Sequence, residues 1–251
     1  MPDPDYFETP QGRRLAYHRS AGQEGPCIVF LGGLKSDMEG TKALHLEAWA
    51  RARRRAFLRF DYSGHGQSGG QFEDGCIGEW HEDTREAVSA LTDGPLVVVG
   101  SSMGGWQALL LGRAMPERIA GMVTVAAAPD FTEDSYWANF TDAQKRELDE
   151  AGQVELPSDY MEPYIVTRKM IEDGRRHLVL RAPLSLPFPV RCLQGTADTA
   201  VSHAVALRLL DHAQSPDMRL TLVKDADHRF SDGPCLSMIA AAVLDVSGER
   251  A

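Results

Sequence analysis

Cysteine, long apolar runs and positive charge are all scarce in this sequence of 251 residues. The four cysteines are scattered and include no CxxC pair, and Cys27 and Cys192 fall inside apolar, strand-like runs, which favours buried thiols in a reducing compartment. No apolar run approaches the ~20 residues that cross a bilayer. The first residues have neither the basic and apolar regions of a secretory signal nor the basic character of a transit peptide. We therefore expect a cytoplasmic protein without a transmembrane segment.

The shortage of positive charge excludes another class of protein. Lys and Arg number 26 against 36 Asp and Glu, so the formal net charge is −10, and such a chain offers no electrostatic footprint for a nucleic-acid backbone. The arginine cluster at positions 51–55 ends a helix-like stretch, where basic residues compensate the helix dipole. No group of His, Cys and Asp has metal-ligand spacing, and the acidic run 81–83 is typical of the solvated face of a helix. We expect neither a metal nor another cofactor.

Short apolar runs alternate with helical stretches along most of the chain. The expected strands cover residues 15–18, 27–31, 56–60, 96–99, 119–127, 190–193 and 219–223. The expected helices cover about 41–54, 77–91 and 103–114, a stretch from 204 onward, and about 236–246. Strands that are apolar on both faces and alternate with helices indicate an α/β fold, in which a mostly parallel sheet is flanked by helices.

This rhythm breaks between residues 130 and 189. The stretch combines aromatic residues with many charges and looks helical at about 141–151 and 158–172, with no strand predicted. So long a segment without a strand is unusual inside a sheet protein. We therefore predict a helical cap at 130–189, inserted late in the sheet, and a core formed by 1–129 and 190–251.

Two windows, 66–70 and 100–104, match the pattern G-x-S-x-G. In a nucleophile elbow this pattern forms a sharp turn between a strand and a helix, which exposes the serine at the carboxyl edge of the sheet. Only the window at 100–104 lies between an apolar run and a helix-compatible stretch, so Ser102 is the candidate nucleophile. The other window lies in a glycine-rich loop. That loop also matches G-x-G-x-x-G at 64–69, but no helix is predicted to open after it, as a dinucleotide site requires.

A serine nucleophile needs a base that takes its proton and an acid that orients the base. In folds with this elbow the chain order is Ser, acid, His, which excludes the histidines before Ser102. His228 lies in a polar loop just after the last expected strand and is the predicted base. The later histidines His177, His203 and His212 fall in the cap or on a surface-like helix.

The predicted acid is Asp198, in the turn after the strand at 190–193. The alternative role for Asp198 is a helix N-cap or an Asx turn, and Asp130, after the strand at 119–127, is the rival acid. Asp225 and Asp227 are expected only to line the loop of His228.

Attack on a carbonyl also requires N–H donors where negative charge develops on oxygen. We predict the backbone N–H groups of Met103, directly after the nucleophile, and of Leu34, in the loop after the strand at 27–31. Aromatic residues of the cap, among them Trp137, Tyr160 and Tyr164, either line an acyl groove or only pack the cap onto the sheet.

Four motifs carry a resemblance: FLGGLKSDMEGTKA at 30–43, RFDYSG at 59–64, GSSMGGW at 100–106 and DHR at 227–229. They resemble the α/β-hydrolase superfamily and, within it, the family of mitochondrial palmitoyl-protein thioesterases and acyl-glucuronide esterases. The resemblance covers nearly the whole chain and implies the α/β-hydrolase fold with an eight-stranded sheet. It also implies that Ser102, Asp198 and His228 form the catalytic triad. Gly32 stands where we expect a proline, and the cap diverges most. Since the sequence starts directly at the domain, we expect a bacterial relative.

These observations predict a serine hydrolase that cleaves carboxylic esters or thioesters through an acyl-enzyme. The expected substrate is a small molecule or an S-acylated protein. Acyl transfer or carbon–carbon bond hydrolysis on the same fold is the alternative reaction. A non-catalytic binding module is the alternative class, but such modules usually lack a residue of the triad. The sequence leaves the natural substrate, the acyl chain length and the oligomeric state open.

Overall fold

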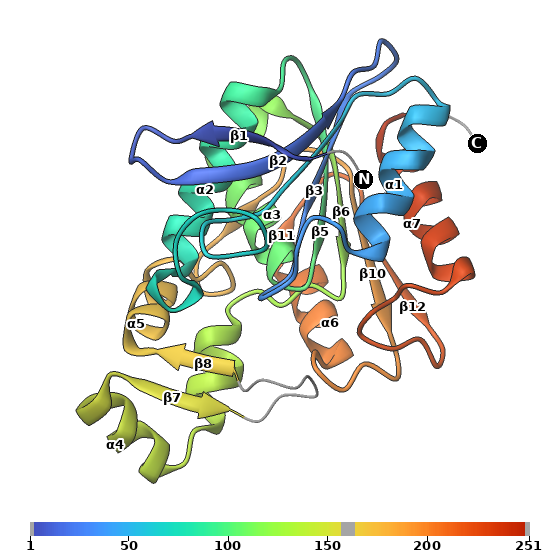
Figure 1. Ribbon diagram of the computed structural model, residues 1–251. Helices are drawn as coiled ribbons and strands as arrows, with labels where there is room; N and C mark the ends of the chain where they lie inside the picture. The colour runs from blue at the N-terminus through green and yellow to red at the C-terminus, as the bar shows by residue number, and fades with distance from the viewer. Residues whose placement is uncertain (1–2, 157–163, 249–251) are drawn as a thin grey trace.

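An eight-stranded sheet forms the centre of the computed structural model, which describes residues 3–156 and 164–248 (Figure 1). From one edge to the other, its strands are β1 (Asp5–Glu8), β2 (Arg14–Ser20), β4 (Phe57–Phe60), β3 (Cys27–Leu31), β5 (Leu96–Ser101), β6 (Ile119–Val125), β10 (Val190–Gly195) and β12 (Met218–Val223). Strand β2 runs antiparallel to β1 and β4, and every pair from β4 to β12 is parallel. The predicted mostly parallel, eight-stranded sheet is confirmed.

Helices cover both faces of the sheet. One face carries α1 (Thr41–Ala52) and α7 (Gly233–Val246), and the other carries α2 (Ile77–Leu91), α3 (Met103–Ala114) and α6 (His203–His212) (Figure 1). Alternate residues of one strand enter different cores: Ile28 and Phe30 of β3 pack with α1 and α7, while Val29 and Leu31 pack with α2 and α3. This alternation explains why the inner strands read as continuous apolar runs.

The predicted cap contains strands as well as helices. Residues 130–189 form a π-helical turn (Thr132–Trp137), α4 (Asp142–Ala151), β7 (Gln153–Leu156), β8 (Tyr164–Thr167), α5 (Arg168–Arg176) and the short β9 (Leu184–Ser185). Strands β7 and β8 pair antiparallel, and β9 pairs with β11 (Ala213–Gln214) beside α6. The prediction that this stretch contains no strand is therefore wrong, and so is the predicted helix at about 158–172 over Tyr164–Thr167; residues 158–163 of that prediction lie outside the described residues. Tyr164–Thr167 reads YIVT, and such β-branched and aromatic residues favour a strand when a partner is present.

Two buried carboxylates in the segment 130–189, Asp130 and Asp173, accept hydrogen bonds from backbone N–H groups. Asp130 accepts hydrogen bonds from the backbone N–H groups of Val179 (2.8 Å) and Leu180 (3.0 Å) and from Arg181 (2.9 Å). Asp173, on α5, accepts a hydrogen bond of 2.6 Å from the N–H of Gly78 in the first turn of α2. The second contact joins α5, in the predicted cap, directly to α2.

Candidate active site

Ser102 lies at the sharp turn where β5 passes into α3. Its backbone adopts φ 56° and ψ −119°, a conformation that L-residues rarely adopt and that costs energy. The turn requires glycine on both sides: a Cβ on Gly100 would lie 2.2 Å from the Gly104 carbonyl oxygen, and one on Gly104 would lie 2.1 Å from that of Leu31. Strand, turn and helix thus form the local geometry expected for the window at 100–104.

The side chains of Ser102, His228 and Asp198 form one hydrogen-bonded chain. His228 Nε2 lies 3.1 Å from Ser102 Oγ, and His228 Nδ1 lies 2.9 Å from Asp198 Oδ2. The three residues come from the ends of β5, β10 and β12, which are close together in the sheet order. The carboxyl ends of parallel strands meet at one edge of a sheet, which is why residues 126 positions apart in the chain become neighbours.

The Asp198 carboxylate is fully buried and accepts four hydrogen bonds. Besides His228, its donors are the Gln194 side chain (2.8 Å) and the backbone N–H groups of Ala200 (2.9 Å) and Val201 (2.8 Å). Burial alone raises the pKa of Asp198, but the hydrogen bonds, led by that from His228, outweigh it, so this pKa lies below its ordinary value. Asp198 is therefore held as a carboxylate. Gln194, which orients it, carried no signal in the sequence.

The loop after β3 lies directly against the serine. A Cβ on Gly33 would lie 3.4 Å from the Cβ of Ser102, so the backbone that precedes Leu34 borders the nucleophile. Met103 is the first residue of α3, and the N–H groups of a first helical turn have no partner within the helix. The structure therefore brings the predicted Leu34 and Met103 segments to the same serine.

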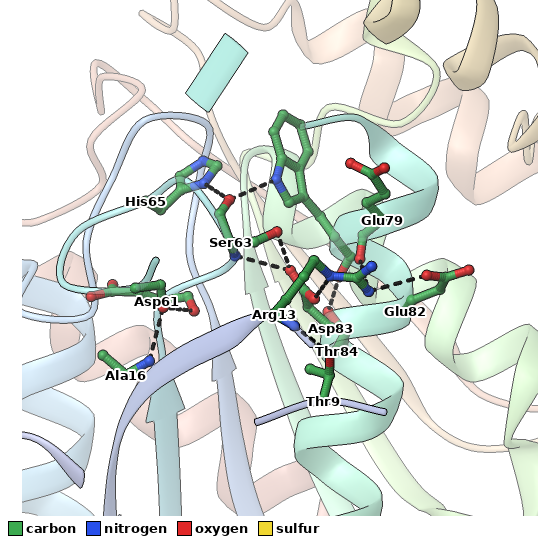
Figure 2. Close-up of polar contacts among 12 residues, drawn as sticks. Thr9, Arg13, Ala16, Asp61, Ser63, His65, Glu79, Glu82, Asp83 and Thr84 are labelled. Atoms are coloured by element: carbon green, nitrogen blue, oxygen red, sulfur yellow. Dashed lines mark hydrogen bonds and ion pairs between the residues drawn. The ribbon is translucent and has the colours of Figure 1, made fainter. Parts of the chain in front are cut away.

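The glycine-rich loop at 61–69 is a scaffold for the neighbouring loops. No helix opens directly after it; the next element is a short 3-10 turn, Phe72–Asp74. Asp83 of α2 accepts hydrogen bonds from the N–H (2.9 Å) and hydroxyl (2.6 Å) of Ser63 and pairs with Arg13 at 2.6 Å (Figure 2). Asp83 is completely buried, so the prediction of a solvated acidic face at 81–83 is wrong for this residue. The periodicity of α2 alone did not reveal that the 61–69 loop covers it.

The rival acids lie elsewhere or have other partners. Asp130 is buried and engaged with the cap segment described above. Asp227 accepts a hydrogen bond of 3.0 Å from the N–H of Phe230, and Asp225 is exposed.

Two of the later histidines also have partners away from Ser102. His177 lies 3.5 Å from Asp173, and His212 lies 2.8 Å from the Ala182 carbonyl oxygen.

Two of the three cap aromatics predicted at the site can be described. Tyr164, on β8, contacts the Lys35 ammonium at 5.6 Å from its ring centre, which links the cap to the loop next to Ser102. The Trp137 ring contacts Lys145 at 5.0 Å and Arg175 at 4.6 Å, both within the cap. Tyr160 lies outside the described residues.

Among residues 3–156 and 164–248, no cluster of three or more His, Cys, Asp and Glu side chains has the arrangement of a metal site. No helix within the same ranges is long and apolar enough to span a bilayer.

The fold and this edge of the sheet define a class of protein. The sequence profile of the alpha/beta hydrolase family matches residues 28–241, from the loop-bearing strand β3 to the last helix. The chain belongs to the alpha/beta hydrolase family, and it is thus a member of a family of hydrolases.

Named relatives narrow this class. The rat protein named palmitoyl-protein thioesterase ABHD10, mitochondrial, is 32% identical over 96% of this chain and 81% of its own length. The structure of mouse alpha/beta hydrolase domain-containing protein 10 has a TM-score of 0.89 at 29% identity and covers 98% of both chains. A structure from Agrobacterium vitis S4, described only as a hydrolase, has a TM-score of 0.94 at 38% identity and covers 98% of this chain and 99% of its own. The resemblance seen in the sequence motifs is confirmed.

Proposed function

We propose that this protein is a serine hydrolase of carboxylic esters or thioesters that works through an acyl-enzyme. The observation that carries the proposal is the hydrogen-bonded chain from Ser102 Oγ to His228 Nε2 (3.1 Å) and from His228 Nδ1 to Asp198 (2.9 Å). In this assignment Ser102 is the nucleophile, His228 the general base and acid, and Asp198 the residue that fixes the histidine tautomer and stabilises the imidazolium.

In the first half-reaction the Oγ of Ser102 attacks the acyl carbon while its proton passes to His228 Nε2. The oxyanion of the tetrahedral intermediate accepts hydrogen bonds from the N–H groups of Leu34 and Met103. Collapse of the intermediate breaks the bond to the leaving alcohol or thiol, which takes the proton from His228. The acyl group remains on Ser102 as an ester.

In the second half-reaction a water molecule attacks this ester. His228 accepts a proton from the water, the oxyanion forms again at the same N–H groups, and Ser102 leaves with the proton returned by His228. The products are a carboxylic acid and the free enzyme, so the cycle needs no cofactor. The lowered pKa of Asp198 supports this two-step mechanism, because an Asp198 carboxylate is required to stabilise the His228 imidazolium in both steps.

For the substrate we propose an acyl thioester or acyl ester, of a small molecule or of an S-acylated protein, with the acyl chain under the cap. This proposal is supported by the rat and human relatives, both of which are named palmitoyl-protein thioesterases. Tyr164, beside the loop of Leu34, is the cap residue best positioned to contact an acyl chain; Trp137 and Tyr160 are proposed with it. Residues 130–189 are the proposed cap and 1–129 with 190–251 the proposed core.

The four cysteines are free thiols, which favours a reducing compartment. We propose the cytoplasm as this compartment; the relatives are named as mitochondrial proteins.

The test is hydrolysis of matched acetyl and palmitoyl thioesters, with kcat/KM measured for each and the Ser102→Ala protein as the blank. We expect turnover of both that is lost in the blank, with palmitoyl preferred. Preference for acetyl would contradict an apolar acyl groove. Thioester hydrolysis that persists in the blank would contradict the serine mechanism.

A further inference from the structure

The loop that carries the proposed oxyanion donor Leu34 contains a tight turn from Gly33 to Ser36. The Gly33 carbonyl oxygen accepts a hydrogen bond of 3.2 Å from the N–H of Ser36 and a second, of 2.9 Å, from the Ser36 hydroxyl. Lys35, between them, has φ 55°, the left-handed conformation at the third position of a turn. One residue, Ser36, thus supplies two donors to one carbonyl.

This carbonyl belongs to the same peptide unit as the N–H of Leu34. Because the peptide is planar and trans, its C=O and N–H point in opposite directions. Two donors that hold the Gly33 oxygen on one side therefore direct the Leu34 N–H to the other side. The peptide borders the nucleophile, since a Cβ on Gly33 would lie 3.4 Å from that of Ser102.

We propose that Ser36 is a positioning residue of the oxyanion hole: its hydroxyl fixes the orientation of the Gly33–Leu34 peptide. The inference rests on the proposed serine hydrolase mechanism. Ser36 acts through the Leu34 N–H and does not itself touch the reacting atoms, so it affects the transition state more than substrate binding.

Other contacts hold the loop as a whole and leave this orientation to Ser36. The Tyr62 hydroxyl donates to the Gly32 carbonyl oxygen at 3.3 Å. At the far end, Asp61 accepts a hydrogen bond from the Met38 N–H at 2.6 Å, and Arg59 donates to the Met38 carbonyl oxygen at 3.1 Å. These hydrogen bonds end on Gly32 and Met38, on either side of the peptide between Gly33 and Leu34.

Because Ser36 is exposed, the Ser36→Ala variant removes one hydroxyl without leaving a cavity in the core. The backbone donor of residue 36 remains, so the peptide is loosened but not released. We expect kcat to fall about tenfold, less than the ~10²–10³-fold loss seen when an oxyanion donor is removed entirely. KM should stay within about twofold, since ground-state binding does not use the oxyanion geometry.

The experiment measures two rates in the full chain: kcat and KM for p-nitrophenyl butyrate, and the second-order rate of Ser102 phosphonylation by a fluorophosphonate. In phosphonylation Oγ bonds to phosphorus, fluoride leaves and His228 takes the proton, so the reaction needs the same oxyanion hole. Ser36→Thr keeps the hydroxyl and should restore most of both rates. The matched control is Ser237→Ala, which removes an exposed hydroxyl that donates to the Gly233 carbonyl oxygen at 2.9 Å on α7.

Parallel losses of kcat and phosphonylation in Ser36→Ala, with an unchanged melting temperature and rescue by threonine, would support the proposal. Rates equal to those of Ser237→Ala, or a loss confined to KM, would overturn the positioning role and leave the hydrolase assignment intact. If the unsubstituted protein is not phosphonylated at Ser102, the proposed function itself is wrong, and the role of Ser36 with it.

Discussion

Asp198 shows how much of the proposed chemistry depends on one side chain. Its two carboxylate oxygens accept four hydrogen bonds, two of them from backbone N–H groups and one each from Gln194 and His228. An asparagine has the same shape but only one accepting oxygen, and it carries no charge. Whichever way the amide turns, an N–H₂ group then faces a donor.

We predict that Asp198→Asn lowers kcat by about 10²–10⁴-fold, because His228 loses its oriented tautomer and its imidazolium is no longer stabilised. The measurement is kcat for the preferred thioester together with the melting temperature. The control is Asp225→Asn, an exposed residue of the neighbouring loop, which should keep full activity. An Asp198→Asn protein that is folded and within about threefold of the parent rate would rule out the assigned acid.

Single residues differ in how far the sequence predicts their place. Chain order and strand ends restrict the predicted triad to Ser102, Asp198 and His228, and the structure brings these three side chains into one hydrogen-bonded chain. Ser36, Gln194 and Asp83 were not found, since their roles depend on which loop folds against them. A hydrogen bond from Ser36 to Gly33 requires a turn in a segment without periodicity, and the burial of Asp83 requires Ser63 and Arg13 to fold over it.

Among the elements, α5 connects the proposed cap to the core helix α2 through Asp173. Asp173 accepts hydrogen bonds from the Gly78 N–H (2.6 Å) and from Arg176 (2.9 Å), and it lies 3.5 Å from His177. Burial alone raises the pKa of Asp173, but the interactions with His177, the Gly78 N–H and Arg176 outweigh it, so the pKa lies well below its ordinary value. A carboxylate whose pKa is lowered by folding stabilises the fold above its unfolded value of about 3.9, and this stabilisation disappears as the pH falls further.

Asp173→Ala should therefore lower the free energy of unfolding at pH 7 by about 1–3 kcal/mol, because the Gly78 N–H loses its acceptor. The deficit should stay constant down to pH ~4 and shrink below it. Urea unfolding at several pH values measures both quantities. Glu172→Ala, an exposed neighbour on α5, serves as the control. A deficit that is independent of pH below this value would show that packing, not the ionised carboxylate, joins α5 to α2.

Substitution of Trp137, the last residue of the π-helical turn, tests whether this turn contributes to acyl-chain binding. If this ring borders the acyl chain, Trp137→Ala lowers kcat/KM for a palmitoyl thioester more than for an acetyl thioester, because only the long chain loses apolar contact area. We expect this difference. The control is Trp49→Ala on α1, whose ring packs under Arg53 at 4.5 Å and lies outside the cap. Equal losses for both substrates would assign Trp137 to packing between Lys145 and Arg175 alone.

Prediction at the level of elements succeeded for two helices that the sequence marks differently: α2 is amphipathic, whereas α3 is buried along residues 103–112 and is bounded by the glycines of the elbow and by Pro116. The helices over 77–91 and 103–114 match α2 and α3 at both ends. Strands β7 and β8 are not predicted: QVEL in β7 has little strand character, and the strand-favouring YIVT of β8 forms a strand only because β7 pairs with it. Strand β1, with the sequence DYFE, has no buried residue and hence no apolar pattern to detect.

In the whole molecule, the side chains of Ser102, Asp198 and His228 lie together at the carboxyl edge of the central sheet. Strands β5, β10 and β12 end beside the loop after β3, and the cap lies near the same side (Figure 1). This arrangement was predictable, because alternating strands and helices allow few topologies. The cap was predicted only as an insertion, since its charged sequence has no single period. The proposed substrate class depends on the residues of the cap, 130–189.

The assignment of Ser102 as the nucleophile is tested most directly by the intact mass of the protein after treatment with a fluorophosphonate. We predict the addition of one phosphonyl group, located by peptide mapping on Ser102 and absent from Ser102→Ala. Ser101→Ala, which alters the buried neighbouring serine, should label like the parent. Labelling that survives in a folded Ser102→Ala protein, or that maps to another residue, would contradict the central claim that Ser102 is the nucleophile.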